Sequence, residues 1–314
     1  MNLKAFISYV ELPTKIASVV PFIFGISYSL YKYKQINPIL LLIMFISMIC
    51  FDMATTAINN YCDYKNELKH LGDKSSSGNP LFVFNISEKL ALTVIFTLLS
   101  IATVFGIILA FNTNLLILAI GVLCFFVGIF YTYGPIPISR MPLGEIFSGL
   151  FMGGFITFIT IYVNIFREQS FGIYIKGENI TVSFNILTII TIGIVALPLI
   201  TGIANIMLSN NICDLERDIE VNRFTLPYYI GKQNAVKIYG ILYYLAYIAI
   251  ILGMILKILP ITCILVLGTF ILVNKNISLF DKEQIKSKTF VLAIKNFIII
   301  STVYIISVLL GNII

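Results

Sequence analysis

From Leu90 to Tyr133 the chain reads LALTVIFTLLSIATVFGIILAFNTNLLILAIGVLCFFVGIFYTY, without one charged residue. A helix needs about 20 mostly apolar residues to cross a bilayer, so this stretch is long enough to cross twice. The polar triplet Asn112-Thr113-Asn114 lies near its middle and predicts the turn between two spanning helices. The stretch therefore predicts a polytopic membrane protein.

The rest of the chain follows the same pattern. Its 314 residues are 59% hydrophobic and 11% charged, with a mean hydropathy of +0.98, so polar surface is too scarce for a water-soluble globule. Because no long hydrophilic stretch interrupts the apolar segments, we predict an all-α membrane protein with a single domain over residues 1–314. About nine spans are expected, at residues 14–32, 37–60, 88–111, 114–133, 144–166, 184–209, 236–256, 258–274 and 289–310.

Charge placement predicts how the chain is oriented. With the amino terminus in the cytoplasm, most Lys and Arg residues fall in cytoplasmic loops, as the retention of positive charge on that side requires. The net charge of +6 is spread over these loops and is not gathered in one stripe, so no nucleic-acid partner is expected. The first twenty residues lack the features of a cleaved signal peptide, and the first helix is expected to be retained.

Two polar segments on the predicted cytoplasmic side share a motif. They are expected as loops over residues 61–87 and 210–235, and their motifs read NNYCDYKNE at 59–67 and NNICDLERD at 210–218. Asn, Asn, Cys, Asp and a terminal acid recur at matching positions, which indicates two pseudo-repeated halves. Function is expected in these segments first.

The spacing within each motif points to a cation. Residues four apart share one face of a helix, and like charges at that spacing repel one another unless a cation compensates them. Mg²⁺ prefers oxygen ligands and commonly bridges carboxylates to phosphate oxygens. The predicted metal ligands are Asn59, Asp63, Glu67, Asn210, Asp214 and Asp218.

Basic residues accompany the acids in both segments. Lys69 and Lys74 follow the first motif and Arg223 follows the second, and bases that bind phosphate beside acids that bind metal describe a diphosphate site. The alternative interpretation is that both motifs are solvated helix ends with ordinary surface ion pairs. Asp52 continues the stripe of the first motif and could be a further ligand or could pair within the helix bundle.

Two stretches of the sequence are similar to a known family. The run NNICDLERDIEVNRFTLPYYIGKQNA (210–235) resembles the second signature of the UbiA superfamily of intramembrane prenyltransferases, most closely the 1,4-dihydroxy-2-naphthoate prenyltransferases of menaquinone biosynthesis. The run YTYGPIPISRMPLGEIFSGLFMGG (131–154) resembles the loop between the fourth and fifth helices of the same group. In the first motif Asn60 stands where family members usually carry an acid.

The resemblance implies the transfer of a polyprenyl group from polyprenyl diphosphate to an aromatic acceptor, with Mg²⁺ as cofactor. It implies that Asp63, Asp214 and Asp218 act with the metal, while Asn59, Lys69, Lys74, Asn210 and Arg223 bind the diphosphate. Tyr131 and Arg140 would lie where the acceptor enters, although they could equally form an interfacial aromatic belt with its arginine. Glu145 could position the acceptor hydroxyl. The implied location is the plasma membrane, as a multi-pass protein whose active site faces the cytoplasm.

Two alternatives stay open from the sequence. A UbiA-type prenyltransferase could use another acceptor, such as a different quinone precursor. A membrane transporter could also carry acidic residues in internal repeats, although both motifs here lie at the ends of spans and not near the bilayer midplane.

Overall fold

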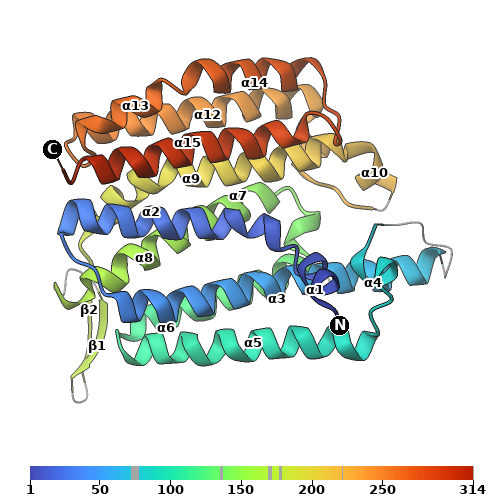
Figure 1. Ribbon diagram of the computed structural model, residues 1–314, viewed down its shortest axis with the longest axis horizontal. Helices are drawn as coiled ribbons and strands as arrows, with labels where there is room; N and C mark the ends of the chain where they lie inside the picture. Colours follow the sequence, from blue (N-terminus) through green and yellow to red (C-terminus); the bar gives the residue numbers. More distant parts are fainter. Residues whose placement is uncertain (72–77, 135–136, 169–171, 177–178, 221, 314) are drawn as a thin grey trace. The chain divides into compact units, whose positions relative to one another are not determined.

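The computed structural model describes residues 1–71, 78–134, 137–168, 172–176, 179–220 and 222–313 (Figure 1). The chain divides into two compact units. The first comprises Met1–Val19 and Pro38–Pro137, and the second comprises Val20–Asn37 and Ile138–Ile314. Whether the whole chain acts as a single domain stays a prediction.

Helices of membrane-spanning length dominate the described residues, as the sequence predicts. Eight are long and apolar enough to cross a bilayer, and up to nine if the bent pair Leu3–Tyr9 and Leu12–Tyr33, with 51° between its parts, forms one span. That pair consists of α1 (Leu3–Tyr9), η1 (Leu12–Lys15) and α2 (Ile16–Tyr33). The other spans are α3 (Pro38–Leu71), α5 (Glu88–Phe111), α6 (Leu115–Thr132), the run of α7 (Gly144–Ser148), η4 (Gly149–Phe155) and α8 (Ile156–Ile165), then α9 (Ile186–Cys213), α12 (Lys232–Ile255), the run of η6 (Ile261–Cys263), α13 (Ile264–Leu267) and α14 (Phe270–Lys282), and α15 (Phe290–Leu310).

In the first unit, α3 packs against α5 and α6 through small and aromatic residues. The Phe51 ring stacks on Phe125, with 4.2 Å between the ring centroids. A Cβ added to Gly128 would meet the Phe51 ring at 2.5 Å, so the absence of a side chain at Gly128 gives this ring its place against α6. The fully buried Ala54 and Ala102 contribute to the same contact region. The short helix α4 (Pro80–Val83) also packs on α3.

The first polar segment begins later than the sequence predicts. Helix α3 continues to Leu71, so the motif at 59–67 is helical throughout and does not open a loop at Tyr61. Residues 59–71 contain neither proline nor glycine, and their Glu, Lys and Leu residues favour a helix whether or not lipid surrounds it. Hydropathy locates the end of the apolar region, and here the helix continues beyond that end.

In the second unit, α9 lies at the centre of the packing. Gly149 and Gly153 of α7 to η4 face Ile200 of α9, where an added Cβ would come within 2.6 Å of the Ile200 carbonyl oxygen and amide nitrogen, respectively. Helices α12 and α15 pack on α9 as well. The segment from Gly144 is therefore pressed against α9, and this contact places the start of α7 beside the end of α9.

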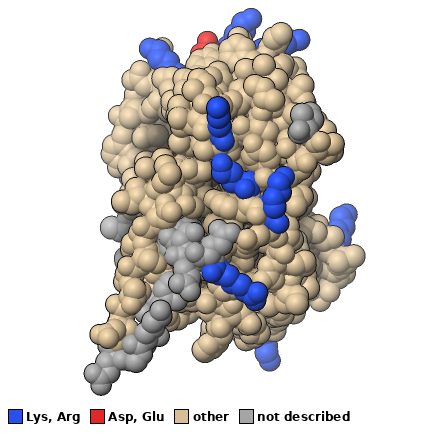
Figure 2. Space-filling model, turned by 90° about the vertical axis from the view of Figure 1, so that its left-hand side faces the viewer, with Lys and Arg blue, Asp and Glu red and all other residues tan. Residues whose placement is uncertain are grey.

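The remaining short elements of the second unit connect these helices. They are η3 (Ile138–Arg140), η5 (Phe166–Glu168), the antiparallel hairpin of β1 (Gly172–Lys176) and β2 (Asn179–Ser183), α10 (Leu215–Glu220) and α11 (Leu226–Ile230). The hairpin contains the only β-strands among the described residues. On the side of the molecule that carries this hairpin, most of the surface in view is uncharged, and the charged side chains are nearly all Lys or Arg (Figure 2).

The predicted turns between adjacent spans are confirmed. Asn112 caps the end of α5 and the Asn114 side chain caps the start of α6 by accepting from the Leu116 amide at 3.0 Å. Between α12 and η6, Lys257 adopts a positive φ of 56° and Pro260 precedes η6. Both breaks therefore follow from the residues that the sequence places there.

Candidate functional site

The second motif forms a polar surface where α9 ends. Cys213 is the last residue of α9, and Asp214 follows with a φ of −96° and a ψ of 4°. The hydrogen bonds keep the helical spacing through this turn, because the Asp214 amide donates to the Asn210 carbonyl and the Asp218 amide donates to the Asp214 carbonyl. The turn therefore preserves the shared face of Asn210, Asp214 and Asp218 that the spacing predicts.

A lysine that is distant from the motif in sequence contacts this face. Lys286 lies between α14 and α15, and its Nζ donates to Asp214 Oδ2 at 2.5 Å and to Asn210 Oδ1. The same ammonium lies 4.9 Å from the centroid of the Phe290 ring. Asn210 and Asp214 thus present their oxygens to one positive charge.

Asp218 is buried and lies beside Arg223. Arg223 Nη1 is 3.6 Å from Asp218 Oδ1, and the Arg223 amide donates to the Asp218 carbonyl at 2.8 Å. The backbone turns back toward Asp218 at Asn222, which has a φ of 55°. Asparagine tolerates this left-handed region better than most residues do. Burial raises the pKa of the Asp218 carboxyl, and the Arg223 guanidinium partly offsets that rise. Asp218 Oδ2 is buried without a hydrogen-bond partner.

Arg223 also anchors a network that reaches α7. Its Nε donates to the Ser139 carbonyl at 3.1 Å and its Nη2 donates to Asn211 Oδ1 at 3.3 Å. Asn211 Nδ2 in turn donates to Glu145 Oε1 at 2.8 Å. Glu145 is buried, and its Oε2 has no hydrogen-bond partner. The sequence indicated Arg223 and Glu145 separately and marked Asn211 as part of the repeated motif, but it did not predict that Asn211 links them.

The first motif lies on the polar end of α3, in the first unit. Asn59 and Asp63 are exposed and Glu67 is half-buried, and their spacing of four places them on one helix face. The backbone of Lys69 belongs to the last turns of α3, and Lys74 lies outside the described residues. Tyr131, in the last turn of α6, and Arg140, in η3, are both half-buried.

Asn60 has a structural role that accounts for an asparagine, and not an acid, at this position of the first motif. It is buried, and its Nδ2 donates to the Tyr9 carbonyl at 2.9 Å and to Glu11 Oε1 at 3.3 Å. Asn79 Nδ2 donates to the Asn60 carbonyl at 2.9 Å. The Asn60 side chain therefore ties α3 to the segment that follows α1, where a donor is required and an acid would lack one.

Asp52 pairs within the first unit. Its Oδ1 accepts from Lys15 Nζ at 2.7 Å and its Oδ2 accepts from Ser18 Oγ at 2.6 Å. Lys15 Nζ also donates to Thr56 Oγ1 and to the Asp52 carbonyl. Both carboxylate oxygens are satisfied, so the structure favours the pairing alternative over the interpretation of Asp52 as a metal ligand.

The donor set around the second motif fits a hard cation. No group of three or more His, Cys, Asp or Glu side chains converges within the described part of the chain. The oxygens of Asn210 and Asp214 nevertheless meet at the Lys286 ammonium, and Asp218 Oδ2 has no partner. One amide oxygen and two carboxylates suit Mg²⁺. This ion commonly binds one or two carboxylates and completes its coordination shell with water and phosphate oxygens.

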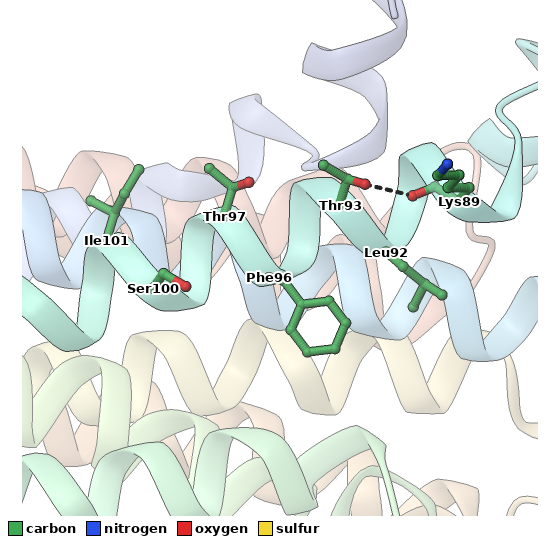
Figure 3. Close-up of a pocket in the computed structure, with 7 residues that line it drawn as sticks. All are labelled: Lys89, Leu92, Thr93, Phe96, Thr97, Ser100 and Ile101. Carbon is green, nitrogen blue, oxygen red and sulfur yellow. Dashed lines mark hydrogen bonds between the residues drawn. The ribbon is translucent and has the colours of Figure 1, made fainter.

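An open groove elsewhere in the first unit does not carry comparable chemistry. It follows one face of α5 and contains no carboxylate, and the Thr93 hydroxyl within it donates to the Lys89 carbonyl at 2.8 Å (Figure 3). Phe96 in this groove is 64% exposed, as expected for a helix face in contact with lipid. The lining residues are Lys89, Leu92, Thr93, Phe96, Thr97, Ser100 and Ile101.

Comparison with known proteins agrees with this architecture. A UbiA homolog from Aeropyrum pernix K1 matches the structure with a TM-score of 0.67 at 17% identity, over 94% of this chain and 98% of that chain. A UbiA homolog from Archaeoglobus fulgidus bound to GPP and Mg²⁺ matches with a TM-score of 0.64 at 16% identity, over 99% of this chain and 100% of that chain. These matches show a shared fold.

The sequence comparisons identify the family. A 1,4-dihydroxy-2-naphthoate octaprenyltransferase from Bacillus subtilis (strain 168) is 27% identical over 238 residues, which are 76% of this chain and 70% of that protein. Residues 18–298 match the UbiA prenyltransferase family, so the match spans both acidic motifs and all helices from α3 to α14. The chain therefore belongs to the UbiA prenyltransferase family.

Proposed function

We propose that this prenyltransferase transfers a polyprenyl group from polyprenyl diphosphate to 1,4-dihydroxy-2-naphthoate, in menaquinone biosynthesis. The observation that carries the proposal is the polar surface at the end of α9, where Asn210 and Asp214 surround a positive charge and Asp218 lies beside Arg223. The Bacillus subtilis relative, whose name specifies this acceptor, supports the choice of naphthoate.

The oxygens of the two motifs would hold Mg²⁺. When it is bound, Mg²⁺ would neutralise the charge that develops on the diphosphate as it leaves. The Archaeoglobus fulgidus homolog bound to GPP and Mg²⁺ supports this assignment. Asp218 has a free buried oxygen to contribute, and Asn210 and Asp214 already present theirs to a cation. The proposed ligands are Asn59, Asp63, Glu67, Asn210, Asp214 and Asp218.

Basic residues would bind the diphosphate itself. Arg223 is fixed by its hydrogen bonds to Ser139 and Asn211, and a guanidinium carries five N–H donors, so donors are left for phosphate oxygens. Lys69 and Lys74 would add charge from the first motif. With the leaving group neutralised, the bond from the prenyl carbon to oxygen breaks and a bond to an acceptor ring carbon forms. That ring carbon then loses the group it carried, a proton or, at the carboxylated carbon, carbon dioxide, and the ring becomes aromatic again. The apolar helices would keep water from the allylic cation.

The acceptor would be bound through residues from the last turn of α6, η3 and α7. Glu145 has a buried oxygen without a partner, which can accept a hydrogen bond from an acceptor hydroxyl. Its other oxygen is tied to Asn211, and Asn211 is tied to Arg223, so acceptor and diphosphate binding are linked within the second unit. Tyr131 and Arg140 are the further residues proposed at the acceptor entrance.

The proposal includes an orientation in the membrane. The bias of Lys and Arg toward the loops that contain the motifs supports a cytoplasmic amino terminus and a cytoplasmic active site. In a bacterium such as that of the relative, the membrane would be the plasma membrane.

The acceptor can be tested directly. Purified protein in liposomes is given a polyprenyl diphosphate, Mg²⁺ and either 1,4-dihydroxy-2-naphthoate or 4-hydroxybenzoate, and prenylated products are identified by mass spectrometry. We expect a prenylated naphthoquinol and little benzoate product. Preferential prenylation of benzoate would refute the acceptor and leave the prenyltransferase assignment intact. The family assignment already favours prenyl transfer over the transporter alternative.

A further inference from the structure

The connection between α14 and α15 holds Lys286 in a defined place. The buried Thr289 closes this turn, because its Oγ1 accepts from the Ile285 amide at 2.9 Å while its own amide donates to the Ile285 carbonyl at 2.8 Å. The Gln284 side chain donates to the Phe280 and Asp281 carbonyls and so caps the end of α14. The backbone on either side of Lys286 is therefore anchored.

The Lys286 ammonium is held by groups from two helices. Asn210 Oδ1 and Asp214 Oδ2 belong to the end of α9, and the Phe290 ring belongs to the first turn of α15. The ring face attracts a cation and the two oxygens accept its hydrogen bonds. The Lys286 side chain is 44% exposed, whereas that of Asp214 is 21% exposed, so the ammonium can leave for solvent while the acid stays in place.

A second lysine in the same turn provides the contrast. Lys288 is 3.5 Å from Glu283, and both side chains are about half-exposed or more. Such a surface pair has little energetic effect. Lys286, in contrast, compensates the residues that the proposed function assigns to the metal.

We propose that Lys286 is a tethered counter-cation that occupies the oxygens of Asn210 and Asp214 until a divalent cation displaces it, and that it thereby sets the affinity of the second motif for metal. This inference rests on the proposed function, because it takes Asn210 and Asp214 as metal ligands. Lys286 is a positioning residue in this account.

The size of the effect follows from the distance between the charges. A unit positive charge about 4 Å from a bound cation weakens its binding by roughly fivefold in water, and by much more where the surroundings are less polar. Lys286 is half-exposed and would be screened by water, so the lower end of that range applies. Removal of this charge should tighten divalent-cation binding by about tenfold.

The test measures Mn²⁺ binding to the purified protein in lipid, without any prenyl substrate, by electron paramagnetic resonance of the free ion. Lys286→Gln should bind Mn²⁺ about tenfold more tightly than the parent. Lys286→Arg, which keeps the charge, should bind as the parent does. Lys288→Gln is the matched control, and it should also match the parent because Lys288 contacts Glu283 and not the motif.

The possible negative results distinguish the Lys286 proposal from the proposed metal site. If the parent binds Mn²⁺ and Asp214→Asn weakens that binding, but Lys286→Gln leaves it unchanged or weaker, the Lys286 proposal is overturned and the proposed metal site stands. If the parent binds no Mn²⁺, or if Asp214→Asn has no effect, the metal assignment of the second motif fails and the Lys286 proposal fails with it.

Discussion

Replacement of Asp52 by asparagine tests whether the buried ion pair of the first unit supports the fold. The variant keeps the shape of the side chain and removes its charge. The Lys15 ammonium then stays buried with only neutral acceptors, which are the new amide oxygen, the Thr56 hydroxyl and the backbone carbonyl of position 52. The side chains of Lys15 and Asp52 are only 5% and 13% exposed, so water can do little to compensate.

The magnitude follows from that burial. Removal of one partner of a buried ion pair costs about 3–5 kcal/mol, because the remaining charge is left without compensation. At about 2–4 °C of Tm per kcal/mol for a chain of this size, the Tm should fall by roughly 10 °C. A double variant, Lys15→Met with Asp52→Leu, removes both charges and should recover most of the loss.

The assay is thermal unfolding in detergent, followed by a thiol-reactive dye. Cys50 is buried in the first unit, four residues before Ala54 in the same cluster, so its thiol becomes accessible when this unit opens. Lys65→Gln is the matched control, because its pair with Glu88 is about half-exposed and such surface pairs contribute little to stability. A Tm of Asp52→Asn equal to that of the parent, or a double variant less stable than the single one, would refute the reasoning.

Three further predictions test the packing, the first motif and the metal. Gly153→Ala would bring a Cβ within 2.6 Å of the Ile200 amide nitrogen and should cost about 1–3 kcal/mol of stability. In Gly193→Ala the added Cβ has no neighbouring atom within 4 Å, so this variant should be neutral or slightly stabilising. Equal Tm values for the two variants would contradict the packing argument. Asn60→Asp removes the donor to the Tyr9 carbonyl and should destabilise by about 1–3 kcal/mol in thermal unfolding, whereas a gain in stability would argue that the family acid belongs there. Chelation of divalent cations should abolish prenyl transfer and added Mg²⁺ should restore it; activity that persists in chelator would remove metal from the mechanism.

Most of the fold is predictable from the sequence because the hydropathy of the chain identifies the spanning helices. The uncharged run from Leu90 to Tyr133 and its Asn-capped turn give α5 and α6 within a residue or two. The continuation of α3 to Leu71 is not predictable from hydropathy, because a polar helix and a polar loop have the same composition there. The β1–β2 hairpin alternates clearly only over residues 180–183, which is too short a pattern to predict more than a connection between two spans.

The candidate site is predictable only where its residues are neighbours in sequence. The spacing of Asn210, Asp214 and Asp218 predicts their shared face, and the structure preserves it. Lys286 is 72 positions from Asp214, and nothing in its local sequence distinguishes it from Lys288. Its role depends on how α14 and α15 pack against α9, which is a tertiary property. Asn211 belongs to the repeated motif, but its link to Glu145 was not predictable for the same reason, because that partner is 66 positions away.

The central claim is that both acidic motifs act in Mg²⁺-dependent prenyl transfer. The most direct measurement is the rate of diphosphate release by the purified protein in liposomes. The assay contains polyprenyl diphosphate, 1,4-dihydroxy-2-naphthoate and Mg²⁺. Asp63→Ala and Asp214→Ala should each lower the rate by about a hundredfold or more, because each removes charge that stabilises the leaving group. Glu216→Ala, which removes an exposed acid between Asp214 and Asp218, should release diphosphate at the parent rate. Parent-like rates in both aspartate variants would contradict the account.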